Sequence, residues 1–293
     1  MALAQSVIFA LEAGSYLAVA TVGFTLIYGV VNMINFAYGE YMTIGAYTAF
    51  ISMQLFDVGV LLTIPIVIVV SMVAGYAISR VTFVPMRGAG AVPLLLASIG
   101  LGMLLRNGYR LVGGANIRFI DFRVQVYRTE ALGGFFINTR HGLVIGSAFV
   151  VFVLIHVLMT RTNAGIAMRA TSHSELLARA SGINTDRVRR NVWLMSSGLA
   201  GFSGFLLGLT SSIAPLMGFD EVLLVIAAAI LGGVGSVYGA VIGAYVIGFV
   251  MIFSSSYLPG AISNLGTVFA FLLLIIMLLV RPTGIADVAE GDV

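Results

Sequence analysis

The sequence contains no cysteine and no lysine, and charged side chains make up only 9% of its 293 residues. The absence of cysteine excludes disulfides, thiolate nucleophiles and cysteine-ligated metals. Because all 15 basic residues are arginines, a P-loop lysine and Schiff-base chemistry are excluded as well. Hydrophobic residues make up 60% of the chain. A soluble globular domain carries roughly 25% charged residues, so this composition predicts an all-α polytopic membrane protein.

Helical spans are indicated by long apolar stretches, because a membrane-crossing helix needs about 20 mostly apolar residues. The N-terminal stretch MALAQSVIFALEAG lacks the basic start of a signal peptide and continues to Val31, so we expect an uncleaved first span. The stretch 222–256 is too long for one span and is broken by GGVGSVYG at 232–239, so it forms either a helix plus a re-entrant piece or two short helices. We therefore expect eight or nine spans in a single transmembrane domain, 1–293. The candidate stretches are 7–31, 33–56, 60–84, 92–112, 142–160, 192–213, 222–256 and 262–280.

Two polar loops, 113–141 and 161–191, are separated by one span and therefore face opposite sides. The second is richer in arginine, so the positive-inside rule predicts a cytoplasmic 161–191 and a long extracytoplasmic 113–141. The same parity places the N-terminus outside and Arg80 and Arg87 inside. Two passes through 222–256 would bring Arg281 inside as well.

The segment YGEYMTIGAY at 38–47 has a shorter counterpart, YGAVIGAY, at 238–245. Each follows an apolar stretch interrupted by small or polar residues, a pattern typical of an inverted repeat whose broken helices line a transporter's central site. Glu40 fits this hypothesis, because a carboxylate in hydrocarbon needs a protein-lined or watery surrounding. Alternatively, Gly- and Ala-rich helices resemble one another because both pack closely. The candidate path residues are Asn35, Tyr38, Gly39, Glu40, Gly232, Gly233 and Gly235.

The loop segment 169–191 has the pattern of a short amphipathic helix. Leu176, Leu177 and Ala180 fall on one face, Glu175 and Arg179 form an i,i+4 pair, and Gly182 is placed as a C-cap. We expect a helix from Arg169 to Gly182 that docks in a groove of a partner. The alternative is a solvated basic loop that only sets topology.

The remaining polar residues do not predict catalysis. His141, His156 and His173 lie in different segments without a second ligand at metal spacing, so neither a metal site nor a cofactor is expected. The sequence shows no paired acids or nucleophile–base pair, so no catalytic residue is expected. Asp220 and Glu221 suit the N-terminus of a helix, or a contact with a partner protein.

Five motifs in order resemble the permease subunits of branched-chain (hydrophobic) amino-acid ABC importers, of the LivH type. They are GFTLIYGVVNMINFAYGE at 23–40, SRVTFVPMRG at 79–88, MRATSHSELLARASGINTDRV at 168–188, AAAILGGVGSVYGAVIGAYVIG at 227–248 and RPTGI at 281–285. Two positions depart from the family pattern. Tyr38 stands where a histidine is usual, and Asp220-Glu221 stands where a lysine is frequent.

The resemblance implies a multi-pass protein of the plasma membrane of a prokaryote, surrounded by lipid, that is not itself an enzyme. It implies a second homologous permease subunit in a heterodimer, two ATP-binding subunits and an extracytoplasmic substrate-binding protein, with no nucleic acid. The ATP-binding subunits would hold the coupling loop at Arg169, Ala170, Glu175, Leu176, Leu177 and Gly182. Related permeases import urea or short amides, which is one alternative. An ion-driven secondary transporter with Glu40 as its coupling carboxylate is another.

Overall fold

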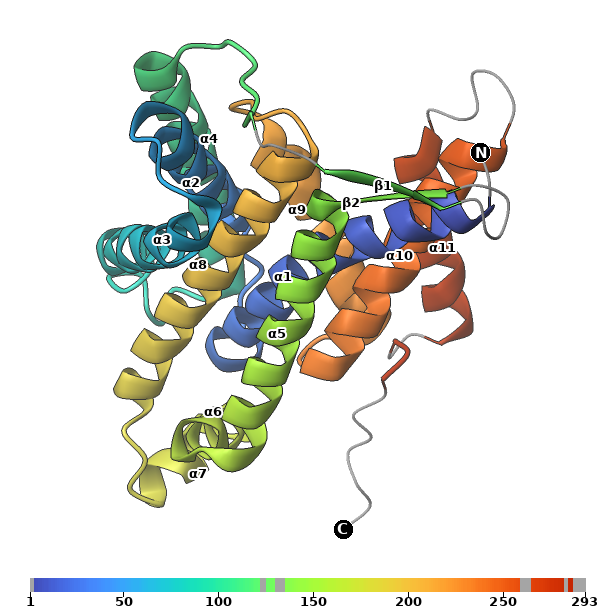
Figure 1. Cartoon of the computed structure of the whole chain (residues 1–293). Helices are drawn as coiled ribbons and strands as arrows, with labels where there is room; N and C mark the ends of the chain where they lie inside the picture. Colours follow the sequence, from blue (N-terminus) through green and yellow to red (C-terminus); the bar gives the residue numbers. More distant parts are fainter. Residues whose placement is uncertain (1–2, 122–124, 130–134, 259–264, 282–283, 287–293) are drawn as a thin grey trace. The chain divides into compact units, whose positions relative to one another are not determined.

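The computed structural model describes residues 3–121, 125–129, 135–258, 265–281 and 284–286. Helices dominate these residues, and one short antiparallel hairpin pairs Val126 with Asn138 (Figure 1). The helices are α1 Leu3–Val31, α2 Tyr38–Phe50, the π-helical turn η1 Ile51–Leu55, α3 Val60–Thr82, α4 Ala91–Gly113, α5 Thr139–Arg161, α6 Asn163–His173, α7 Glu175–Ala180, α8 Thr185–Thr210, α9 Met217–Gly232, α10 Val237–Tyr257 and α11 Gly266–Val280, and the strands are β1 Val126–Thr129 and β2 Phe135–Asn138.

Six of the described helices are long and apolar enough to cross a membrane: α1, α3, α4, α5, α8 and α10. The shorter α11 is also apolar, and α2 with η1 and α9 occupy the other predicted stretches. The break at 232–239 divides the stretch 222–256 into α9 and α10, as expected. The all-α polytopic fold class is confirmed. The first part of the stretch 262–280, residues 262–264, lies outside the described residues.

The second predicted stretch, 33–56, is wrong at its start, because residues 32–37 are not helical and α2 begins at Tyr38. Asn32 has a positive φ of 55°, which ends α1 in a left-handed conformation that asparagine tolerates. The side-chain Oδ1 of Asn35 then accepts a hydrogen bond from the Ala37 amide at 3.0 Å. This local turn satisfies a backbone group that a continuous helix would have satisfied.

Two polar loops contain more regular structure than their composition indicates. α8 begins at Thr185, well before the predicted 192, because Asn184 caps it by accepting a hydrogen bond from the Arg187 amide at 3.0 Å. The loop 113–141 contains the β1–β2 hairpin, which hydrophobic patterning did not predict. Arg123 and Glu130 of this loop lie outside the described residues.

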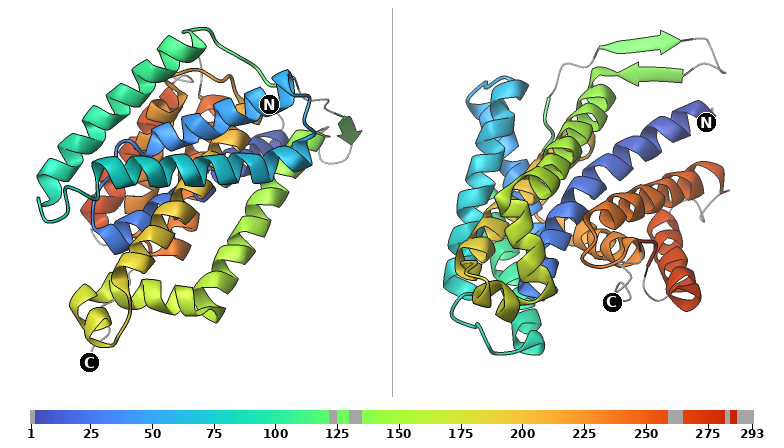
Figure 2. Two further views of the ribbon diagram at one scale, coloured as in Figure 1. Left: turned by 90° about the vertical axis from the view of Figure 1, so that its left-hand side faces the viewer. Right: turned by 90° about the horizontal axis from the view of Figure 1, so that it is seen from below.

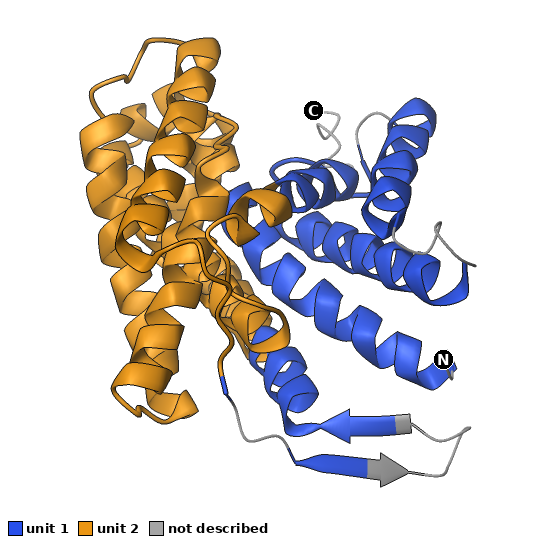
Figure 3. Ribbon diagram, turned by 90° about the horizontal axis from the view of Figure 1, so that it is seen from above, with its two compact units in different colours: residues 1–25, 121–149, 223–293 blue, residues 26–120, 150–222 orange. Residues whose placement is uncertain are grey.

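The chain forms two compact units, which Figure 3 colours separately. Unit 2 comprises residues 26–120 and 150–222, and α8 packs in it against α2 and α3. Small residues make this packing close. A Cβ added to Gly204 would overlap the Met42 carbonyl, and one added to Gly75 would overlap the Ser197 side chain. Such small-residue contacts are typical of helix pairs in membranes.

Unit 1 comprises residues 1–25, 121–149 and 223–293. In it, α1 packs against α10, where Gly14 leaves room for the Tyr245 ring and the hydroxyls of Ser15 and Tyr245 lie 3.0 Å apart. Two residues before Gly14 in the same helix, Glu12 lies 2.9 Å from His141 Nδ1 and 3.4 Å from Arg140 Nε. A buried carboxylate in α1 thus has its partners at the start of α5.

Candidate functional site

The break between α1 and α2, together with the first turn of α2, holds four of the predicted path residues in unit 2. Asn35 is fully buried, and its backbone oxygen accepts a hydrogen bond from the Tyr38 amide at 3.2 Å. Tyr38, the first residue of α2, is also buried, and its hydroxyl donates to the Ser196 carbonyl of α8 at 3.4 Å. Gly39 allows α2 to touch the start of α9, because a Cβ there would overlap the Gly218 carbonyl. The break therefore places the first turn of α2 in a closely packed interior.

Glu40 lies in that first turn and is only 1% exposed. Its Oε1 accepts hydrogen bonds from Arg106 of α4, at 3.0 Å from Nη2 and 3.3 Å from Nε. Its backbone oxygen accepts one from the Tyr109 hydroxyl at 3.1 Å. The Arg106 guanidinium also lies 4.1 Å from the centre of the Phe219 ring in α9. An acidic group near a helix N-terminus is favoured by the helix dipole, so Glu40 joins α2 to α4 as a charge-balanced, hydrogen-bonded group.

The second break, between α9 and α10, holds the other predicted path residues in unit 1. Gly233 and Gly235 have φ values of 99° and 97°, which only glycine adopts easily. Gly232 ends α9 and meets the Gly239 backbone so closely that a Cβ would overlap its carbonyl. The amides of Ile285 and Ala286 donate to the Leu231 and Gly232 carbonyls at 2.9 and 3.0 Å. The open end of α9 is thereby closed by the segment after α11.

The two breaks share a local pattern. Tyr38 opens α2, Tyr238 is the second residue of α10, and in each case a glycine follows at the point of backbone contact. The repeated sequence pattern therefore corresponds to a repeated helix–break–helix structure. The two sets of path residues lie in different units. That the halves form an inverted repeat stays a prediction.

The predicted coupling segment folds as two short helices rather than one. α6 ends at His173 and α7 begins at Glu175, because the Ser174 hydroxyl accepts a hydrogen bond from the Leu177 amide at 3.3 Å and so starts a new helix. The predicted single helix from Arg169 to Gly182 is therefore wrong. Gly182 has a φ of 82°, which confirms the predicted left-handed cap. Figure 2 shows α6 running across from the end of α5 to α7, which lies near the start of α8.

Glu175 fixes α7 to the following helix. Its carboxylate pairs with Arg179 at 2.8 Å and also with Arg189 of α8. The predicted i,i+4 pair of Glu175 with Arg179 is confirmed, and Arg189 is a second partner that the sequence did not indicate. Arg169 donates to the Met159 carbonyl at the end of α5, and the Ala170 carbonyl accepts from the Ser174 amide at 3.1 Å. The segment is thus held at both ends by its neighbours.

Leu176 and Leu177 are the apolar tip of this anchored segment. They are 82% and 70% exposed, whereas their neighbour Ala178 is buried. The predicted apolar face thus exists for the leucine pair. This exposed pair lies outside the predicted spans, where lipid does not cover apolar side chains, so it is a candidate contact for a protein partner.

The structure also tests the predicted sidedness of two basic segments. Arg87, after α3, forms an ion pair with Asp186 of α8 at 2.7 Å. Arg80 lines the same pocket as Arg187 and Arg190. The segment at 80–87 and the arginine-rich loop therefore lie on the same side of unit 2, as the count of spans predicted.

Residues 6–278 match the family model described as branched-chain amino acid transport system / permease component. The chain belongs to this family. It is 30% identical over 300 residues to the high-affinity branched-chain amino acid transport system permease protein BraD of Pseudomonas aeruginosa, covering 98% of this chain and 97% of BraD. It is 32% identical over 292 residues to LivH of Escherichia coli K12, covering 95% and 94%. It is 25% identical over 293 residues to LivM of Escherichia coli K12, covering 90% and 66%.

A solved structure has a similar fold. PsaBC from Streptococcus pneumoniae in complex with Fab matches with a TM-score of 0.53 and 14% identity, covering 96% of this chain and 92% of that chain. As a family member the chain is a multi-pass protein of the plasma membrane, and its relatives are transport permeases rather than enzymes.

Two groups of buried charge were missed from the sequence of this permease. Arg106 was overlooked because it stands near the end of an apolar stretch, where arginine usually reaches the interface. Glu12 was overlooked because it lies in the first apolar stretch, far in sequence from Arg140 and His141. The available signal was that an acid inside a span needs a partner. Each apolar stretch with an acid should therefore have been matched against the basic residues of the other stretches.

Proposed function

We propose that this chain is the permease subunit of an ATP-driven importer for branched-chain or other hydrophobic amino acids. An extracytoplasmic binding protein delivers the substrate, and two separate ATP-binding subunits supply the energy. A second homologous permease completes the membrane part, as the match to both LivH and LivM supports. The observation that carries the proposal is the exposed Leu176–Leu177 pair, held on a capped and ion-paired support, in a chain of this family.

The proposed coupling surface consists of α6 and α7 with Arg169, Ala170, Glu175, Leu176, Leu177 and Gly182. Leu176 and Leu177 enter a groove of an ATP-binding subunit, because their apolar surface has no cover within the described residues. Glu175 does not enter the groove itself but fixes α7 to α8 through its ion pair with Arg189. Arg169 and Ala170 hold the α6 end of the surface, and Gly182 turns the chain back toward α8.

The proposed translocation path is lined at Asn35, Tyr38, Gly39 and Glu40 from one break and at Gly232, Gly233 and Gly235 from the other. Broken helices expose backbone groups, which is tolerated in a membrane only where protein or a water-filled cavity surrounds them. Glu40 supports the path by binding Arg106, so its role is structural rather than ion-coupling.

The coupling surface is tested in the reconstituted complex with its binding protein and ATP-binding subunits. Leu176→Asp removes an apolar contact that the proposed complex buries and adds a charge, so we expect binding-protein-stimulated ATP hydrolysis to fall about tenfold or more, with insertion and folding unchanged. Ser181→Asp is the matched control, because Ser181 is exposed in the same loop and the substitution adds the same charge. Unchanged stimulation with Leu176→Asp would show that the loop is only a topological spacer.

A second pair of variants tests the cap. Gly182→Val forces a β-branched residue into a φ of 82°, whereas asparagine tolerates this region. We expect Gly182→Val to uncouple ATP hydrolysis from substrate delivery and Gly182→Asn to retain most of the coupling. Equal activity of the two variants would mean that the direction of the chain after α7 does not matter. Transport that continues without ATP-binding subunits, driven by an ion gradient, would contradict the proposed function itself.

A further inference from the structure

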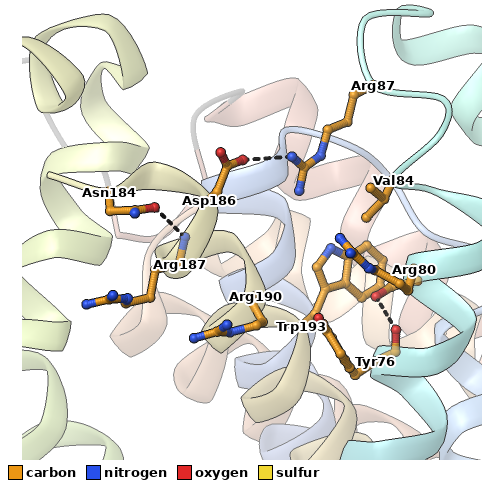
Figure 4. A pocket seen from close by; sticks show the side chains of 10 residues that line it. Tyr76, Arg80, Val84, Arg87, Asn184, Asp186, Arg187, Arg190 and Trp193 are labelled. Carbon is orange, nitrogen blue, oxygen red and sulfur yellow. Dashed lines mark hydrogen bonds and ion pairs between the residues drawn. The ribbon is translucent and has the colours of Figure 1, made fainter.

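A basic pocket lies at the end of α3 and the start of α8 in unit 2. Its volume is about 430 Å³, and Figure 4 shows the side chains around it. Arg187 and Arg190 extend from the first turns of α8, and Arg80 and Arg87 come from the last turn of α3 and the segment after it. Tyr76 and Trp193 form an aromatic wall of the pocket. The Trp193 ring stacks on the Phe83 ring, with the ring centres 5.2 Å apart. These aromatic groups suit the interfacial depth of a membrane.

The charges of this pocket do not balance. Four arginines face one carboxylate, Asp186, which pairs with Arg87. Arg80, Arg187 and Arg190 have no ion-pair partner among the described residues. The N-terminal dipole of α8 adds positive potential beside Arg187 and Arg190 rather than neutralising it. A site with three uncompensated guanidinium groups favours an anion, and the planar guanidinium matches phosphate oxygens in pairs.

An apolar groove follows the pocket along the same two helices. It has a volume of about 180 Å³, and all of the residues that line it are apolar. Residues of α5 form its third wall. On α3, Met72 of the groove lies one turn from Tyr76 of the pocket on the same helix face, because positions four apart are neighbours on a helix surface, and Arg80 is one turn further on. At 1.5 Å per residue, Met72 lies about 12 Å along α3 from Arg80.

On α8, Arg187 of the pocket is in register with Met195 and Phe202 of the groove, by steps of three and four residues. Arg190 and Trp193 of the pocket lie on another face of α8, beside the end of α3. The basic end and the apolar part therefore form one strip on a pair of membrane helices. A free phosphate ion would use only the basic end, whereas a phospholipid would use both.

We propose that this α3–α8 strip is a binding site for an anionic glycerophospholipid of the cytoplasmic leaflet. The phosphate group lies among Arg80, Arg187 and Arg190, and an acyl chain lies in the groove lined by Met72, Leu154 and Phe202. Basic pockets between helices at the cytoplasmic side of a membrane attract such headgroups. The site is separate from the path residues around Glu40 and from the leucine pair of the coupling surface.

The proposal is tested by native mass spectrometry of the purified full-length chain offered phosphatidylglycerol and phosphatidylcholine together. We expect the wild type to retain phosphatidylglycerol selectively. Each arginine near an anionic surface strengthens binding by a factor of roughly five, so Arg187→Gln with Arg190→Gln should weaken retention roughly 25-fold. Arg110→Gln is the matched control, because Arg110 is exposed at the end of α4 and lines neither cavity. Equal retention by the double variant and the control would overturn the proposal.

Two further arms separate the possible sources of the anion. Leu154→Trp fills the groove from a position that is already 61% exposed, so it should reduce lipid retention and leave the arginines intact. If inorganic phosphate competes only weakly with the lipid, that result supports a lipid site. Phosphate binding that survives Leu154→Trp without any preference for phosphatidylglycerol would show a free-anion site. In the assembled complex, loss of ATP-binding subunits from the double variant, with lipid retention by the chain unchanged, would show a protein-docking face. Either of the last two results rejects the proposal.

Discussion

Glu40 and Arg106 are 66 positions apart in the sequence, yet they form a nearly buried ion pair. Among the described residues, neither side chain has a second ion-pair partner. Removing one partner of such a pair leaves an uncompensated charge and costs about 3–5 kcal/mol. Glutamine at position 40 keeps the shape and still accepts from Arg106, whereas leucine does not. The pair therefore explains how a carboxylate is tolerated at the start of a broken membrane helix.

We predict that Glu40→Gln retains more uptake and more stability than Glu40→Leu or Arg106→Gln. The double variant Glu40→Gln/Arg106→Gln should be destabilised by less than the sum of the single variants, because it leaves no isolated charge. Thermal unfolding in detergent and uptake at equal expression measure both. Arg110→Gln, on the same helix but exposed, should stay within about 0.5 kcal/mol of the wild type. If Glu40→Gln and Glu40→Leu are equally inactive, the charge itself is required, and an ion-coupled mechanism gains support.

At the scale of elements, the contact of α2 with α8 depends on glycine rather than on large apolar side chains. Gly45 faces the Gly201 backbone and Gly204 faces the Met42 backbone, so neither neighbour is a flexible side chain that can move aside. This close approach positions the first turn of α2, including Tyr38 and its hydrogen bond to Ser196. The packing of two helices thus determines the geometry of the break.

We predict that Gly204→Ala lowers the stability of the chain by about 1–3 kcal/mol, because the added methyl group forces α2 and α8 apart. Gly100→Ala is the matched control, since Gly100 is also helical but has no atom within 4 Å of an added Cβ. It should be neutral or stabilising by up to about 1 kcal/mol. Unfolding midpoints measured in the same detergent compare the two. Equal midpoints would mean that α2 and α8 are not packed as described.

At the scale of the whole molecule, the sidedness of the loops follows from the number of crossings and the distribution of arginine. Arg80, Arg87 and the loop 161–191 belong to one side, and 113–141 to the other. Because the chain has no cysteine, single cysteines introduced in these loops can be labelled without a background.

We predict that Asn116→Cys reacts with a membrane-impermeant maleimide in intact cells, whereas Ser181→Cys reacts only after the membrane is opened. Both positions are exposed, so access through the membrane is the variable that is measured. Labelling of each variant in opened membranes provides the control for reactivity. If Ser181→Cys reacts in intact cells, the topology is the opposite of the predicted one, and the proposed coupling surface lies outside the cell.

The sequence by itself determined the features that depend on neighbouring residues. Apolar length predicted the six described helices that are long enough to cross a membrane, although eight or nine spans were expected. The glycines of 232–239 predicted the interruption of 222–256, and Gly182 was correctly placed as a cap. These features follow from hydrophobicity and from the φ values that single residues adopt, so a short stretch contains the information. The local signals that were misjudged, Ser174 and Asn184 as caps, are of the same kind.

Only the tertiary structure decided which distant residues meet. The partners Arg106 for Glu40, His141 for Glu12 and Arg189 for Glu175 depend on which helices are adjacent and on their rotation. In a membrane this choice rests on the close packing of small residues, because lipid and leucine are equally apolar and hydrophobicity does not select a neighbour. The arginine pocket and its groove arise in the same way, from a register between α3 and α8 that Gly75 and Gly198 permit by leaving room for Ser197 and Met72.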